Sequence, residues 1–172
     1  MKDDAMSDNT DYQYAMKHAL KFLAKREYSR RLLLDKLLKK SCEFDICEQV
    51  LDDLATKSFL SDQRFADAYV RDAVIKYRGP LRITSELEQK GVARNVISDA
   101  LSQIGNWQEI ATTSAQKKVS YEAALDCFES EQLEQLMQNN KKKVLAHLAY
   151  QGFDYDLSES VADSLERNYC AY

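Results

Sequence analysis

The amino-acid sequence repeats one helical pattern three times. Without a gap, residues 30–54 align with residues 80–104 and with residues 141–165. The coinciding positions include a leucine and, four residues later, a small residue: Leu37, Leu87 and Leu148, then Ser41, Gly91 and Gly152. Repetition on this scale is typical of modular helical arrays, which present an extended surface to a partner. The repeat therefore favours a protein that binds another macromolecule over an enzyme with a single closed pocket.

The composition strengthens the helical interpretation. The 172 residues include only 4 Gly and 1 Pro, and 45% of them are hydrophobic. Few helix breakers and many helix formers favour helix over strand, and the chain is long enough for a substantial core. We predict an all-α fold of about nine helices.

Local signals place these helices in three units. We expect a disordered tail at residues 1–10, a first repeat at 11–60, a second at 61–105 and a third at 106–172. The third repeat carries an acidic insertion at about 120–139, which we interpret as extended or additional helix. Each repeat is expected to contain three helices, the first of them at about residues 11–25.

Several residues are predicted to begin or end these helices. Ser29, Asp62 and Asn140 are expected N-caps, because their side chains can accept hydrogen bonds from free amides of the next turn. Gly79-Pro80 occupies the place of Ser29-Arg30, and proline is tolerated at the first position of a helix. Gly91 and Gly152 are expected to end helices with a positive φ, and the alignment puts Ser41 in the same position.

The charges of the chain are unevenly distributed. The net charge is −4, which disfavours a general nucleic-acid binder. Residues 15–41, however, hold nine Lys and Arg against two acids, whereas residues 106–172 hold six against eleven. This polarity favours a partner whose own surface is unevenly charged.

The basic region supplies the first candidates for a binding surface. Lys17, Lys21 and Lys25 are spaced four residues apart and are expected to share one face of the first helix. The alternative is that this face is simply the solvated side of an amphipathic helix. The remaining candidates are all Lys or Arg: Arg26, Arg30, Arg31, Arg64, Arg71, Arg82 and Lys90. In contrast, Phe65, Ala66, Tyr69 and Val70 have the helical spacing of core residues.

No motif indicates catalysis, a cofactor or a metal. The sequence has no GxSxG or HExxH motif, and Gly79-Pro80 lacks the further glycines and Lys of a nucleotide-binding loop. The four cysteines do not have zinc-site spacing, and we interpret them as reduced structural thiols. His18 and His147 are interpreted as ordinary histidines, and Asp52-Asp53 as a polar helix face. We expect no enzyme, no cofactor and no metal.

The sequence also lacks signals for a membrane or for export. No apolar run approaches the roughly 18–20 residues that cross a bilayer, and the N-terminus lacks the features of a signal peptide. We therefore expect a cytoplasmic protein.

Three segments resemble the RecX family of bacterial recombinase regulators. They are LAKREYSRRL at residues 23–32, LSDQRFADAYV at 60–70 and GPLRI at 79–83 followed by KGV at 90–92. A weaker match is YQGF at residues 150–153. The chain departs from the family pattern at Ser41, where a glycine is usual, and at Tyr150-Gln151, where basic residues are usual.

The resemblance implies a fold and a function. The fold is three tandem three-helix repeats that form an elongated, curved array. The function is binding along the groove of the RecA–DNA filament, which inhibits ATP hydrolysis, strand exchange and filament growth and so regulates recombination, DNA repair and the SOS response. The expected partners are RecA and the DNA within the filament, and we expect a monomer. The main alternative is a helical protein that binds DNA directly and independently of RecA, because short three-helix units resemble helix-turn-helix modules.

Overall fold

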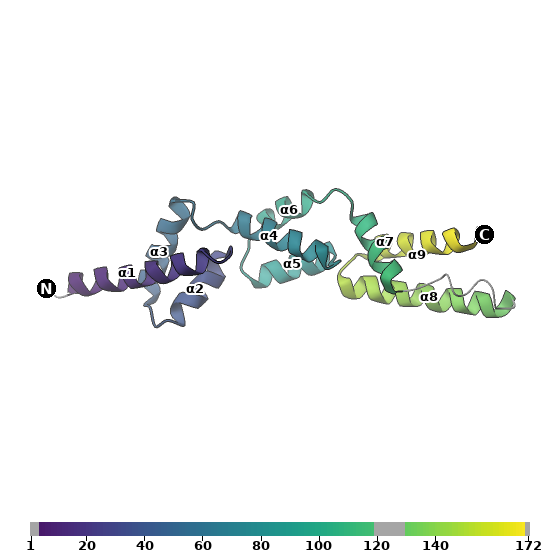
Figure 1. Cartoon of the computed structure of the whole chain (residues 1–172), viewed down its shortest axis with the longest axis horizontal. Helices are drawn as coiled ribbons and strands as arrows, with labels where there is room; N and C mark the ends of the chain where they lie inside the picture. The colour runs from purple at the N-terminus through teal and green to yellow at the C-terminus, as the bar shows by residue number, and fades with distance from the viewer. Residues whose placement is uncertain (1–3, 119–129, 171–172) are drawn as a thin grey trace. The chain divides into compact units, whose positions relative to one another are not determined.

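The structure is a computed structural model that describes residues 4–118 and 130–170, and in these residues all regular structure is α-helical (Figure 1). The prediction of an all-α fold is confirmed. The described helices are α1 (Asp4–Leu23), α2 (Arg30–Leu38), α3 (Phe44–Thr56), α4 (Asp62–Ile75), α5 (Pro80–Gln89), α6 (Arg94–Ser102), α7 (Trp107–Lys118), α8 (Ser130–Gln151) and α9 (Tyr155–Cys170).

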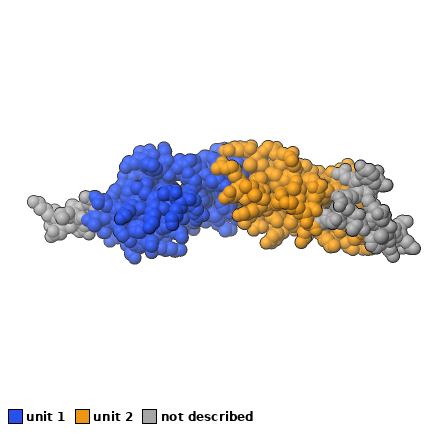
Figure 2. Space-filling model, in the orientation of Figure 1, with its two compact units in different colours: residues 1–70, 86–101 blue, residues 71–85, 102–172 orange. Residues whose placement is uncertain are grey.

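The chain forms two compact units. Unit 1 contains residues 1–70 and 86–101, and unit 2 contains residues 71–85 and 102–172 (Figure 2). The helix order agrees with three helices in each predicted repeat, but the boundary between the units falls within α4 and α5. The middle helices are thus shared between two units, and the division into three repeats stays a prediction.

The core of unit 1 lies among α1, α2 and α3, which pack against one another. Leu33 and Leu37 on α2 are completely buried because they lie four residues apart on one helix face. Val50 and Leu54 have the same spacing on α3 and are also buried. Ala19 on α1 is fully buried as well.

The core of unit 2 is built in the same way from α7, α8 and α9. Val144 and Leu148 on α8 have no exposed surface, and Val161 and Leu165 on α9 are buried against the same cluster. Leu148 is the residue that the alignment pairs with Leu37, so the repeat predicts the buried position correctly in both units.

The middle helices confirm most of the predicted core positions. Phe65, Ala66 and Val70 on α4 are buried, as is Leu87 on α5. Tyr69 is only half-buried, and its hydroxyl donates a hydrogen bond of 2.6 Å to Glu86 Oε2. The ring therefore packs while its polar end is satisfied by a carboxylate.

Several helix ends agree with the sequence. The hydroxyl of Ser29 accepts a hydrogen bond from the amide of Leu32 at 3.2 Å, which confirms the predicted N-cap. Gly91 and Gly152 have φ of 79° and 90°. Ser41 has φ of 60°, so it adopts the left-handed conformation that the alignment predicts.

Other predicted ends are wrong. Asn140 lies inside α8 and is 5% exposed, because that helix already starts at Ser130. Asp62 is the first residue of α4, and the hydroxyl of Ser61 accepts from the Arg64 amide instead. Asp62 Oδ1 accepts a hydrogen bond from the Arg30 amide at 2.8 Å, so this carboxylate caps α2 rather than its own helix.

The chain also differs from prediction at both predicted irregular segments. Helix α1 begins at Asp4, within the segment expected to be a disordered tail. Of the predicted insertion at 120–139, residues 119–129 lie outside the described residues, and the remainder belongs to α8.

Unit 1 contains a contact that we call the first junction, where the start of α2 meets the end of α5. The hydroxyl of Ser29 donates a hydrogen bond of 2.6 Å to the carbonyl oxygen of Lys90. The side chain of Arg31 lies directly against Gly91. The side chains of the α2 N-cap and of the first turn of α2 therefore make this junction.

Unit 2 contains the equivalent contact, the second junction, where the start of α5 meets the end of α8. The amide of Gly79 donates to the Gln151 carbonyl at 2.7 Å, and the amide of Leu81 donates to the Gly152 carbonyl at 3.0 Å. In the alignment Gly79 corresponds to Ser29, and Gln151 corresponds to Lys90. The second junction is therefore held by backbone hydrogen bonds.

Candidate functional site

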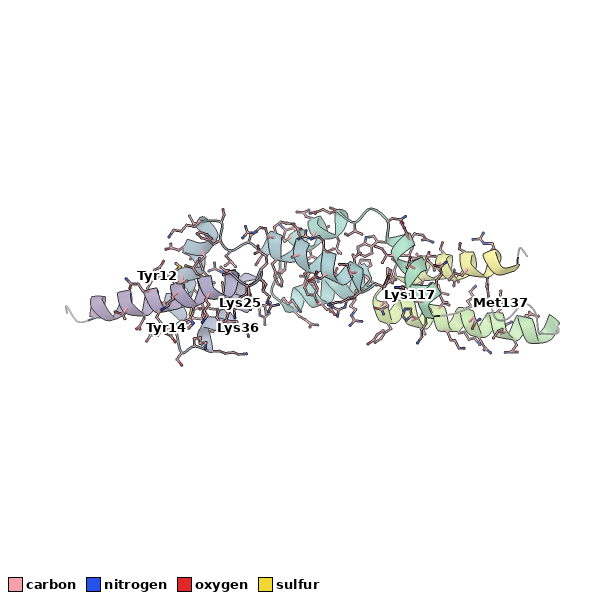
Figure 3. All side chains as sticks on the ribbon, in the orientation of Figure 1. Tyr12, Tyr14, Lys25, Lys36, Lys117 and Met137 are labelled. Carbon is pink, nitrogen blue, oxygen red and sulfur yellow. The ribbon has the colours of Figure 1, made fainter. Side chains whose placement is uncertain are left out.

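Three lysines near the N-terminus form the exposed part of the predicted basic surface. Lys17 and Lys21 lie on α1, and both are exposed while Ala15 and Ala19 on the same helix are fully buried. Lys25 is also exposed, but it lies beyond α1, which ends at Leu23 (Figure 3). The amide of Lys25 donates to the Phe22 carbonyl in the turn that follows the helix. The prediction of one shared helix face therefore holds for Lys17 and Lys21 and not for Lys25.

These lysines have no ion-pair partner within the chain as described. Among residues 10–118 and 134–167, no carboxylate lies within ion-pair distance of Lys17, Lys21 or Lys25. An exposed ammonium without a partner can approach an anion without first breaking an internal contact. The surface of unit 1 thus offers three positive charges for a partner.

Two of the predicted arginines are engaged inside unit 1. The guanidinium of Arg30 contacts Glu48 at 2.5 Å and Asp52 at 2.8 Å, which links α2 to α3. The guanidinium of Arg64 contacts Glu27 at 2.9 Å and donates to the Phe59 carbonyl at 3.0 Å. Both therefore have intramolecular partners that a binding role would have to share.

The remaining candidates contact aromatic rings, take part in a junction or are exposed without such a contact. The guanidinium of Arg26 lies 4.4 Å from the centre of the Tyr28 ring, and Arg26 is exposed. Lys90 and Arg82 are half-buried over aromatic rings, of Tyr69 and Tyr150 respectively. Arg31 lies on Gly91 in the first junction, and Arg71 is exposed on α4. Arg71 and Arg82 belong to unit 2, and the other candidates to unit 1.

The acidic pair on α3 has structural contacts. Asp52 pairs with Arg30, and Asp53 accepts a hydrogen bond of 2.5 Å from the hydroxyl of Tyr12 on α1. This bond, together with burial and the charge of Asp53, raises the pKa of Tyr12 to about 12. Among the described residues, no group of three or more His, Cys, Asp and Glu is arranged to hold a metal ion.

Cys42 and Cys47 are poorly suited to nucleophilic chemistry. Cys47 is fully buried on α3 and Cys42 is half-buried in the preceding loop. Burial is the main cause that raises the pKa of both thiols, that of Cys47 to about 11. At neutral pH Cys47 is therefore a thiol and not a reactive thiolate.

Unit 2 contains a pocket that the sequence did not predict. It has a volume of about 130 Å³ and is lined by residues from three separate segments: Tyr77, Ser114, Lys117, Lys118, His147 and Gln151. The only sequence signal was the adjacent pair Lys117-Lys118, because nothing in the spacing indicates that Tyr77 or His147 lies beside them. Figure 3 marks Lys117 near the C-terminal end of α7.

None of the helices in the described part of the chain is long and apolar enough to span a membrane.

The chain matches two protein-family models. Residues 15–54 match the first three-helix domain of RecX, and residues 61–101 match the second. These ranges contain α2, α4 and α5, nearly all of α3 and α6, and the C-terminal part of α1, so the matches cover the basic surface and the first junction.

Curated relatives extend the match to most of the chain. It is 30% identical over 156 residues to the regulatory protein RecX of Legionella pneumophila, covering 90% of this chain and 97% of the relative. It is 42% identical over 83 residues to the regulatory protein RecX of Halorhodospira halophila, a match that spans 48% of this chain and 52% of the relative.

Solved structures agree on the fold. The crystal structure of RecX from Lactobacillus salivarius superposes with a TM-score of 0.76 at 24% identity, over 92% of this chain and 98% of the other. A second crystal structure of a regulatory protein RecX gives a TM-score of 0.75 at 23% identity, over 93% of this chain and 75% of the other. By its sequence matches along nearly its whole length, this chain belongs to the RecX family of regulatory proteins.

Proposed function

We propose that this protein binds the filament that a RecA-type recombinase forms on DNA, and that it inhibits ATP hydrolysis, strand exchange and filament growth. In this way it regulates recombination and DNA repair in the cytoplasm. Membership of the RecX family supports the regulatory role. The observation that carries the proposal is the surface of Lys17, Lys21 and Lys25, three exposed charges that have no ion-pair partner among the described residues, on a chain whose net charge is −4.

The proposed mechanism is occupancy of the filament rather than chemistry. A cluster of exposed ammonium groups raises the rate of encounter with an acidic surface and helps to fix the orientation of binding. Lys17 and Lys21 lie on α1 and Lys25 in the turn after it, and the opposite face of α1 packs into the buried core of unit 1. Contacts of other exposed basic residues with further parts of the filament would add through effective concentration.

The test is the ATPase activity of RecA on single-stranded DNA with the protein added below the concentration of RecA. The test variant changes Lys17, Lys21 and Lys25 to Glu. The matched control changes the exposed residues Lys57, Lys76 and Lys142 to Glu and so alters the net charge equally. Lys57 forms an ion pair with Asp53 at 3.8 Å, but both side chains are more than half exposed. Losing an exposed pair of this kind changes the free energy of unfolding little.

We expect that at least about tenfold more of the test variant is required for the same inhibition of the RecA ATPase, because charge steering changes association rates by at least that factor. The control variant should inhibit like the unmutated protein. Glu has high helix propensity, so both variants should stay folded by circular dichroism. If the test variant inhibits normally, the three lysines form only a solvated surface. The remaining basic candidates would then be the residues to test for binding to the filament.

The second candidate function is direct binding to DNA without RecA, and the same basic surface favours it. When binding rests on phosphate contacts, the logarithm of the binding constant falls linearly with the logarithm of the salt concentration. A salt titration with single-stranded DNA alone therefore separates the two functions. Tight and steeply salt-dependent binding in the absence of RecA would favour the second.

A further inference from the structure

We propose that the pocket of unit 2 binds a phosphate group, held between α7, α8 and the turn after α4. Helix α7 contributes Ser114, Lys117 and Lys118, and α8 contributes His147 and Gln151. Tyr77 comes from the turn that follows α4. The proposal concerns this protein and its ligand alone, so it does not depend on the RecA filament.

The charge of the pocket is the first argument. Lys117 and Lys118 are exposed, and no described carboxylate lies within ion-pair distance of either. The ammonium of Lys117 instead contacts the hydroxyl of Tyr77 at 2.6 Å and lies 4.3 Å from the ring centre. Lys141 in the same unit is neutralised by Asp163 at 2.5 Å. The two pocket lysines are thus positive charges that the described chain leaves uncompensated.

The neutral polar groups of the pocket are the second argument. Ser114 is 3% exposed, and its hydroxyl shares a hydrogen bond of 3.0 Å with His147 Nε2. Burial, and then the charge of Lys118, lower the pKa of His147 from its ordinary value, while a bond to Ser114 opposes this shift. Burial and the charge of Lys118 both favour the neutral imidazole. The buried Ser114 hydroxyl and the imidazole satisfy one another through their hydrogen bond and form a polar wall of the pocket.

The backbone at Tyr77 is the third argument. Its φ is 56°, a conformation in which a bulky side chain is unusual. The amides of Tyr77 and Arg78 donate to the carbonyls of Val74 and Ala73, so this turn closes α4 in a form that glycine would adopt more easily. Tyrosine at this position instead brings a hydroxyl to the ammonium of Lys117. Ser41 and Ser58 end helices with nearly the same φ, so the feature that distinguishes Tyr77 is the side chain it places at the pocket.

These groups fit a phosphate better than other anions. Two ammonium groups match an anion that carries up to two negative charges, and the hydroxyl and amide groups of Tyr77 and Gln151 can donate to further oxygens. Lys143 lies one turn before His147 on α8 and is exposed. A free phosphate or nucleotide needs only the pocket, whereas a nucleic-acid strand could place its next phosphate near Lys143.

The experiment follows the ring signals of His147 in the full-length protein by NMR, without RecA. One arm adds sodium pyrophosphate, and the other adds a short single-stranded oligonucleotide. The test variant carries Lys117→Gln and Lys118→Gln, and the control variant carries Lys76→Gln and Lys142→Gln, all at exposed positions. Thermal melts verify that both variants are folded.

We expect pyrophosphate or the oligonucleotide to shift the His147 signals. Binding should also raise the pKa of His147, because a bound anion favours the imidazolium. The same probe should bind the test variant at least tenfold more weakly. Shifts with pyrophosphate assign the pocket to free phosphate groups, and shifts with the oligonucleotide alone assign it to a nucleic-acid strand. If neither ligand moves the signals, or if the control variant loses binding as strongly as the test variant, the proposal is wrong. Lys118→Gln alone repeats the test should the double variant fail to fold.

Discussion

The two junctions join equivalent positions of the repeat in different ways. In the first junction, a Cβ added to Gly91 would lie 2.7 Å from Cβ and Cδ of Arg31; the Cδ can rotate away, but the Cβ can move only with the backbone. In the second, a Cβ added to Gly152 would lie 2.3 Å from Cβ and 2.6 Å from the backbone nitrogen of Arg82. Backbone atoms have no such freedom. The same aligned glycine is therefore more tightly constrained in unit 2, where the added Cβ would also overlap backbone atoms.

This difference shows what a repeat in sequence conveys. It identifies positions that share a backbone conformation, and Gly91, Gly152 and Ser41 do share a positive φ. It does not reveal how close the next helix approaches, because that distance depends on which side chains occupy the partner positions. The alignment thus predicts local conformation better than it predicts tolerance to substitution.

The largest expected effect tests whether the two units depend equally on equivalent core residues. Leu37→Ala, Leu87→Ala and Leu148→Ala each remove a side chain with no exposed surface. Each should lower the free energy of unfolding by about 2–5 kcal/mol through lost burial and a cavity. Urea denaturation of the full chain measures this.

Because Leu37 and Leu87 lie in unit 1 and Leu148 in unit 2, the same experiment shows whether the units unfold together. A single transition should shift in all three variants, whereas separate transitions should respond only to substitutions in their own unit. A neutral result for one leucine would contradict its place in the alignment.

The next effect tests the junctions directly. Gly152→Ala should destabilise by about 2–4 kcal/mol, of which about 1 comes from the positive φ and the rest from overpacking against backbone. Gly91→Ala should cost less, about 1–2 kcal/mol, because its added Cβ overlaps only side-chain atoms of Arg31, and by a smaller margin. Gly105→Ala is the control, since nothing lies within 4 Å of its added Cβ. Thermal melts should show the largest loss of stability for Gly152→Ala, a smaller loss for Gly91→Ala and the smallest for Gly105→Ala. Equal losses of stability for Gly91→Ala and Gly152→Ala would contradict the comparison of the two junctions.

The sequence could predict the features that depend on local spacing. Apolar residues three or four apart form one helix face, so the buried leucines and the exposed Lys17 and Lys21 follow from the pattern itself. The N-cap at Ser29 is local as well. The errors at Asn140 and Asp62 arise because these residue types also serve inside helices and as caps of other helices, and composition does not separate these uses.

Long-range contacts could not be predicted in the same way. Arg30 was a binding candidate, but its carboxylate partners Glu48 and Asp52 come from a different helix. The phosphate pocket combines Tyr77, Lys117 and His147 from segments that are distant in sequence. Only the packing of α7, α8 and α9 places the last two together.

The smallest expected effect concerns Ser41, which replaces glycine at the end of α2. Its φ of 60° costs a non-glycine residue about 1 kcal/mol, so Ser41→Gly relieves strain in the folded state. Glycine also makes the unfolded chain more flexible, which offsets about 0.4–1 kcal/mol of that gain. We therefore expect a change between zero and about 1 kcal/mol of stabilisation in urea denaturation. Ser58→Gly should behave alike, because Ser58 has φ of 59° after α3. A clear loss of stability in Ser41→Gly but not in Ser58→Gly would show that the Ser41 side chain has a stabilising role that outweighs its strain, and the equivalence with Gly91 would then end at the backbone.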